Sequence, residues 1–196
     1  MFGRDFNFNF NVPPLQSLIQ RAVDPYLQEP NYAAHLEVAE YINQKKANSY
    51  VATFNKNSDH RDLLLYRPRD AAMTIVRLVN NRNPHVSMLA LGLLETLVQS
   101  CGYPFHLQIS TKEFLNELVR RFPERPPPFP GPVMTKILEL IHTWKETICT
   151  ESRWKDDLGN IRDMHRLLQF KGYRFREMHR QQTSIASTSA NVSDDH

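Results

Sequence analysis

Apolar residues recur along most of this chain at the three- to four-residue spacing of helices, and no segment alternates as a strand does. Seven segments carry such a stripe: 13–24, 31–46, 68–80, 84–101, 110–122, 133–150 and 155–170. The widest stripe, in 84–101, covers nearly half of the helix circumference, which is typical of a helix packed between two neighbours. With a short apolar element at 105–109, the pattern predicts an all-α superhelix of about eight helices rather than a four-helix bundle.

Capping and helix-breaking residues predict where several of these helices begin and end. Asn31 is placed as the N-cap of the second helix, and Pro68 opens the third at a position where a proline is tolerated. Gly102 permits the left-handed backbone that ends the helix at 84–101, and Glu113 is placed for a capping box with Ser110 or Thr111. The inward stripe of the second helix is expected to contain Tyr32, Leu36, Ala39 and either Ile42 or Asn43.

Four segments lack a helical period. Residues 1–12, rich in Asn and Phe, are expected to form a flexible arm, and residues 176–196, rich in Ser and Thr, a disordered tail. Residues 51–67 have a polar middle and are predicted as a loop with one short apolar turn. The proline-rich segment 123–132 is predicted as a stiff spacer, although its PxxP spacing also fits an SH3 ligand.

Composition excludes most catalytic and membrane-spanning classes. The chain has 196 residues, 41% of them hydrophobic, which is enough for one domain with a proper core. No apolar run is long enough to cross a bilayer and no secretory signal opens the chain. The two cysteines, Cys101 and Cys149, are expected as buried thiols of a cytosolic protein rather than as a bridge. No metal-ligand, phosphate-loop or nucleophile motif is found, so we expect no enzyme, no metal and no cofactor. The net charge of +3 is too small for a nucleic-acid binder.

Three blocks of sequence, residues 79–109, 112–122 and 155–175, together resemble the VHS domain of membrane-trafficking adaptors. The first block resembles VHS domains in general, and the other two resemble the fungal branch of the Golgi-localised, gamma-ear-containing, Arf-binding (GGA) adaptors. The resemblance covers residues 13–175 and implies a right-handed superhelix of about eight helices. It also implies a cytoplasmic protein that is peripheral on Golgi, trans-Golgi network and endosomal membranes.

In the animal GGA proteins a groove between the sixth and eighth helices binds acidic dileucine sorting signals of cargo tails. Carried over to this sequence, the groove residues are Asn116, Val119, Phe122, Arg162, His165 and Leu167. Val119 and Leu167 would shape leucine pockets, and Arg162 would meet an aspartate. Glu113 departs from the animal pattern, because it places an acid where those proteins have a base. We therefore expect it to weaken binding of an acidic peptide. Solvated helix faces over a core are the alternative for all these residues.

Two further sites follow from the resemblance. VHS domains bind ubiquitin through an aromatic residue and a leucine on the second helix, which correspond to Tyr32 and Leu36; core packing of this pair is the alternative. The family also binds phosphoinositides. Basic residues that fit this role are Arg120, Arg121, Arg166 and Lys171, for which a merely solubilising surface is the alternative.

The resemblance therefore implies an adaptor module that recognises sorting signals, ubiquitin or phosphoinositide lipid during transport from the Golgi to the endosome or vacuole. A structural helical domain with inert grooves is the rival function. Similar domains pass almost directly from the second helix to the third, so residues 51–67 look inserted. Either a genuine surface loop or translated non-coding sequence accounts for them. The chain is also expected to be part of a longer adaptor.

Overall fold

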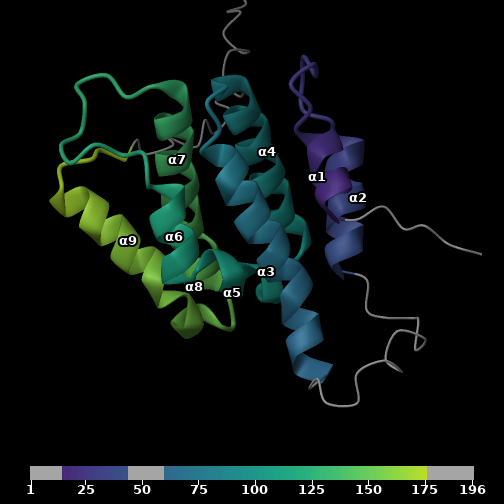
Figure 1. Ribbon diagram of the computed structural model, residues 1–196. Helices are drawn as coiled ribbons and strands as arrows, with labels where there is room; N and C mark the ends of the chain where they lie inside the picture. Colours follow the sequence, from purple (N-terminus) through teal and green to yellow (C-terminus); the bar gives the residue numbers. More distant parts are fainter. Residues whose placement is uncertain (1–14, 44–59, 176–196) are drawn as a thin grey trace, which may run out of the picture.

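The computed structural model describes residues 15–43 and 60–175, and within these ranges it contains helices and turns but no strand (Figure 1). The elements are α1 (Leu15–Ala22), α2 (Tyr32–Asn43), α3 (His60–Val79), α4 (Pro84–Ser100), α5 (Tyr103–Ile109), α6 (Lys112–Leu118), α7 (Pro132–Glu146), α8 (Ile148–Glu151), a 3-10 helix η1 (Lys155–Leu158) and α9 (Gly159–Phe170). The all-helical architecture of about eight helices is thus confirmed. The predicted arm, the predicted tail and residues 51–59 lie outside the described residues.

The prediction for residues 60–67 was wrong. They were expected as the end of a loop, with Pro68 opening a helix, but α3 begins at His60 and continues through Pro68 to Val79. A proline inside a helix loses one backbone hydrogen bond and crowds the preceding turn. Because Pro68 is buried within the fold, packing of its ring offsets part of that cost.

Helices α3 and α4 lie against each other in the middle of the molecule. Helices α1 and α2 pack on one side of this pair, and α5, α6, α7 and α9 continue the stack on the other side (Figure 1). Apart from α1 with α2 and α3 with α4, the larger contacts join helices two or three apart in the chain, such as α2 with α4 and α4 with α7. Helix α4 therefore packs between neighbours on both sides, as the width of the apolar stripe in 84–101 predicted. This order separates the outer face of α2 from α9 by the whole width of the domain.

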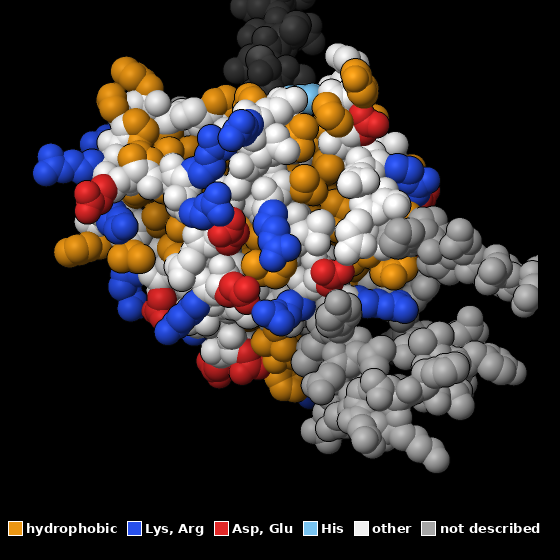
Figure 2. Space-filling view, in the orientation of Figure 1, with side chains coloured by type: hydrophobic (Ala, Val, Ile, Leu, Met, Phe, Trp, Pro, Cys, Tyr) orange, Lys and Arg blue, Asp and Glu red, His pale blue; other side chains and the backbone are white. Residues whose placement is uncertain are grey.

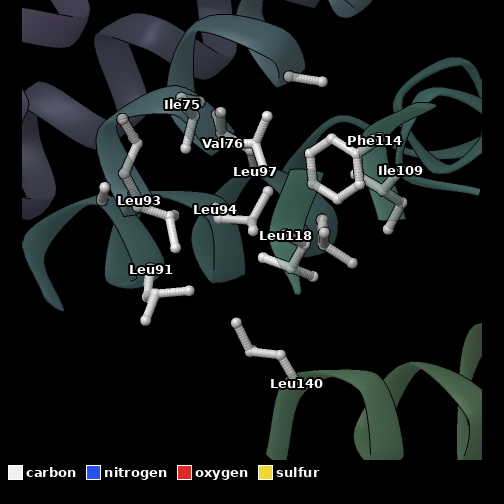
Figure 3. Packing of buried hydrophobic residues seen from close by; sticks show 14 of the residues in the cluster. Ile75, Val76, Leu91, Leu93, Leu94, Leu97, Ile109, Phe114, Leu118 and Leu140 are labelled. Carbon is white, nitrogen blue, oxygen red and sulfur yellow. The ribbon is translucent and has the colours of Figure 1, made fainter. Parts of the chain in front are cut away.

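The core is continuous across the stack. Figure 3 shows apolar side chains of α3, α4, α6 and α7 converging, and those it labels include Ile75, Val76, Leu93, Leu94, Leu97, Phe114, Leu118 and Leu140. Both cysteines are free and buried, as expected. Burial raises the pKa of the Cys101 thiol to about 11, which keeps it neutral and unreactive at physiological pH.

Three local predictions need correction. In α2 the inward face is formed by Ala34, His35, Val38, Ala39 and Ile42, whereas Tyr32 and Leu36 point outward. The N-cap of α6 is Thr111, whose hydroxyl oxygen accepts a hydrogen bond from the Phe114 amide at 3.2 Å. Glu113 is therefore one position too early for a capping box. The helix expected at 133–150 is divided at Thr147 into α7 and α8.

Candidate recognition surfaces

The outer face of α2 presents two large apolar side chains to solvent. Tyr32 is 65% exposed and Leu36 is 59% exposed, and their spacing of four residues places them on adjacent turns of one face. Side chains of this size seldom stay so exposed together without a partner. The alternative that this pair packs in the core is contradicted by the exposure.

The position of this face is fixed by a cap at the start of α2, by a buried ring beneath it and by an ion pair to α1. The Asn31 side chain accepts a hydrogen bond from the Ala34 amide at 3.1 Å, which caps α2 as predicted. Beneath Tyr32 lies the buried ring of His35, with the two rings edge to face and their centroids 5.5 Å apart. Glu37, the residue after Leu36, forms an ion pair with Arg21 and so joins α2 to α1.

The ring of His35 is held by Thr96 of α4. The Thr96 hydroxyl donates to the Gly92 carbonyl at 3.1 Å, and Thr96 Oγ1 also lies within hydrogen-bond distance of His35 Nδ1, at 3.0 Å. Burial lowers the pKa of His35, and its Nε2 is buried without a hydrogen-bond partner. A neutral His35 is therefore part of the support under Tyr32.

Helices α6 and α9, which form the carried-over groove, run side by side in the same direction. At one end the Asn160 side chain donates to the Ser110 carbonyl at 2.9 Å. At the other end the Tyr173 hydroxyl donates to the Pro123 carbonyl at 2.6 Å, and the Tyr173 ring packs on Phe122 with centroids 5.2 Å apart. Figure 2 shows apolar side chains between the positions of these two helices.

The six groove residues are not equally accessible. Asn116 is exposed, Leu167 is 46% exposed, and Val119 and Phe122 are half-buried. His165 is buried and faces α7, where its Nε2 lies 3.2 Å from His142 Nδ1 and Phe175 stacks on its ring at 3.9 Å. Because of this burial, His165 offers no surface to a peptide.

The two charged residues of the groove contact different neighbours. The Arg162 guanidinium donates to the carbonyls of Cys149 and Lys155, at 3.2 and 3.1 Å. The carboxylate of Glu113 pairs with Arg69 of α3 at 3.0 Å. The expectation that Glu113 acts on a ligand of Arg162 is therefore weakened, since Arg69 offsets the charge of Glu113 and Arg162 caps backbone carbonyls.

The four expected lipid-binding bases are all exposed, but they differ in their contacts. Arg120 pairs with Glu117 at 3.0 Å, and Arg166 lies 3.7 Å from Asp163. Arg121 donates to the Asn81 carbonyl at 2.9 Å. Lys171 follows the last residue of α9. The first three side chains are thus partly oriented by the protein itself.

Sequence reasoning missed two further features of the surface. A pocket of about 360 Å³ lies between the end of α3, the start of α4, the end of α6 and the start of α7, with apolar side chains such as Leu118, Phe122 and Met134 in its lining. Phe129 and Phe170 are each 90% exposed. Neither phenylalanine stands out in the sequence, because Phe129 lies among the prolines of an expected spacer and Phe170 lies at the end of an amphipathic helix.

Within residues 15–43 and 60–175, no helix has the length and apolar character needed to cross a bilayer. No group of three or more metal-ligating side chains gathers in the same part of the chain.

Comparison with known proteins identifies the family. The VHS domain family model matches residues 58–172. A probable ADP-ribosylation factor-binding protein of Schizosaccharomyces pombe is 50% identical over 173 residues, which are 88% of this chain and 29% of that protein. The ADP-ribosylation factor-binding protein GGA2 of Saccharomyces cerevisiae is 49% identical over 83% of this chain and 25% of its own length. The chain thus spans between a quarter and three tenths of these relatives.

Among solved structures, the VHS and FYVE tandem domains of Hrs, a protein involved in membrane trafficking and signal transduction, share the fold. The TM-score is 0.60 at 24% sequence identity, and the match covers 91% of this chain and 66% of that one. The family model, which matches more than half of the chain, and the two yeast relatives together show that the chain belongs to the VHS domain family and resembles the GGA-type adaptors of fungi.

Proposed function

We propose that this VHS domain is a recognition module of a membrane-trafficking adaptor and that it binds ubiquitin through the outer face of α2. The single observation that carries this proposal is the exposure of Tyr32 and Leu36 on a capped helix whose opposite face is core. A flat aromatic ring and a branched aliphatic side chain form a small apolar patch. Such a patch favours weak, reversible binding to another apolar surface.

Binding of ubiquitin to the whole chain is the test, measured by calorimetric titration. Tyr32→Ala and Leu36→Asp should each abolish measurable binding. Their thermal midpoints should stay close to that of the wild type, because substitutions of exposed residues usually change stability by less than about 0.5 kcal/mol. Leu167→Asp is a matched control, since Leu167 is a leucine of comparable exposure on α9. Unchanged affinity in Leu36→Asp would overturn the site.

We also propose two further partners, for which the structure offers less support than for ubiquitin. The α6–α9 groove is proposed to take a cargo-tail sorting signal, with Val119 and Leu167 as its apolar contacts and Asn116 as a polar one. An anionic, phosphoinositide-containing membrane is proposed to contact the bases Arg120, Arg121, Arg166 and Lys171. The corresponding place of action is the cytoplasmic face of Golgi and endosomal membranes.

The rival function is a scaffolding domain with inert surfaces. It predicts no binding of ubiquitin, of a dileucine peptide or of anionic vesicles under conditions in which the domain is folded. Titration of one protein sample with all three ligands distinguishes the two functions, because a single saturable response excludes an inert scaffold.

A further inference from the structure

Two phenylalanines project from one edge of the domain. Phe129 lies between two prolines in the segment 123–131, and Phe170 is the last residue of α9; both side chains are 90% exposed. The segment 123–131 and the end of α9 contact each other. Gly172 packs against the ring of Pro126, and the Tyr173 hydroxyl donates a hydrogen bond to the Pro123 carbonyl. The segment 123–131 and the end of α9, which carry the two rings, therefore lie at one edge of the domain, at the left of the molecule in Figure 1.

This edge is also where the positive charge of the chain gathers. Residues 120–131 and 166–174 contain a single acid, Glu124, and six exposed bases: Arg120, Arg121, Arg125, Arg166, Lys171 and Arg174. Since the whole chain has a net charge of only +3, the remaining residues are net acidic. Figure 2 shows basic side chains projecting from this edge beside apolar ones.

Bases interspersed with projecting aromatic rings fit a lipid surface better than a protein partner. A protein interface needs a contiguous, close-packed patch, whereas the two rings are carried by separate segments. At the boundary between headgroups and acyl chains, each ring can be buried independently while the neighbouring bases meet anionic headgroups. The prolines on either side of Phe129 restrict its backbone, so little conformational freedom is lost on insertion.

We propose that this edge is the membrane-docking edge of the domain, with the rings of Phe129 and Phe170 inserted into an anionic leaflet and Arg125, Lys171 and Arg174 on its headgroups. The inference rests on the membrane contact proposed above and adds the groups that enter the bilayer. It also sets an orientation. Helix α2 lies on the far side of the stack (Figure 1), so Tyr32 and Leu36 stay open to a ligand while the domain is docked.

The experiment is sedimentation of the whole chain with vesicles of phosphatidylcholine containing roughly one-fifth phosphatidylserine, an anionic lipid, and a smaller share of a phosphoinositide. Phe129→Ala and Phe170→Ala should each reduce the partition coefficient by about tenfold, because each removes a ring that is buried only in the bound state. Tyr26→Ala is the matched control, since Tyr26 is also 90% exposed but lies between α1 and α2. It should bind like the wild type.

A second arm changes the charge. Lys171→Glu and Arg174→Glu should weaken binding by several-fold, and raising the salt concentration should remove this difference. Wild-type protein should not sediment with vesicles of phosphatidylcholine alone.

The outcomes separate this inference from the proposed function. If the wild type binds anionic vesicles and both phenylalanine variants bind equally well, insertion is overturned while membrane contact through charge stands. If the wild type does not bind at all, both the membrane contact and the insertion are overturned. The ubiquitin titration at α2 decides the remaining part of the proposed function independently.

Discussion

The outer face of α2 and the groove between α6 and α9 were both expected as binding sites, yet they differ in what their side chains already do. Most of the surface of Tyr32 and of Leu36 is exposed to solvent. In the groove, Arg162 caps two carbonyls, His165 is buried against α7, and Phe122 packs on Tyr173. A surface whose side chains are mostly exposed can bind without giving up buried contacts, whereas an engaged side chain must first give up a contact. The difference favours α2 as the principal site.

Replacement of Arg162 should have the largest effect on stability and no gain of function. Arg162→Ala removes the donor of the Cys149 and Lys155 carbonyls, and we expect the free energy of unfolding to fall by about 1–3 kcal/mol. Arg166→Ala, which removes an exposed arginine one turn later in α9, should change it by less than about 0.5 kcal/mol. Urea denaturation measures both. Equal, small losses would mean that Arg162 is available to a ligand.

The two faces of α2 should respond oppositely to truncation. Val38 is fully buried, so Val38→Ala should cost about 2 kcal/mol of stability through lost burial and a small cavity. Leu36→Ala removes a larger side chain but should leave stability nearly unchanged. Thermal unfolding of the two variants tests this contrast. A greater loss for Leu36→Ala would place that side chain in the core.

Stability should fall on mild acidification because of two buried histidines. Burial is the main cause that lowers the pKa of His165; Lys145 and His142 lower it further, and Glu146 opposes them. Burial also lowers the pKa of His35. The unfolded chain then binds protons more readily, so stability is full above the unfolded pKa of about 6.5 and is lost as pH falls below it.

Chemical denaturation at about pH 7.5 and about pH 5.5, on either side of the ordinary histidine pKa, measures this loss. His165→Gln should make the pH dependence shallower, because one of the two groups no longer titrates. A stability that rises on acidification would contradict the assignment of neutral, buried rings.

The smallest effect is expected at Glu113. Glu113→Gln frees Arg69 from its exposed ion pair, and exposed pairs are worth less than about 1 kcal/mol. We therefore expect the affinity for an acidic dileucine peptide to rise by no more than about threefold, and the rise to fade with salt. Fluorescence anisotropy of a labelled peptide measures it. A tenfold or larger gain would restore Glu113 as the residue that blocks the groove.

Much of the fold could be predicted from periodicity, because a wide stripe of leucine and valine, such as that of α4, leaves only one face of the helix that can point toward the core. The inward face of α2 could not be predicted in this way, because it is built largely from small residues and a histidine. Ala34 and Ala39 allow neighbouring helices to approach closely, and the buried ring of His35 is held by a hydrogen bond between its Nδ1 and Thr96. Hydrophobicity alone therefore assigned the larger Tyr32 and Leu36 to the wrong side.

The start of α3 shows a different limit. A proline is normally compatible with the first turn of a helix and unfavourable in its interior, so the sequence places Pro68 at a helix start. Only the tertiary environment allows Pro68 to lie inside α3. Similarly, the partners of the charged groove residues depend on the tertiary structure, and for Glu113 on a helix far away in the sequence. Nothing near Glu113 in the sequence indicates that Arg69 is its partner, or that Arg162 reaches back to the carbonyls of Cys149 and Lys155.

The most direct test of the central claim is a map of backbone amide chemical shifts of the whole chain as unlabelled ubiquitin is added. We predict that the perturbed amides cluster on α2 around Tyr32 and Leu36, with few changes on α6 and α9. We also predict that Leu36→Asp removes the perturbations while the rest of the spectrum stays in place. Perturbations that cluster on α6 and α9, or that persist in Leu36→Asp, would contradict the claim.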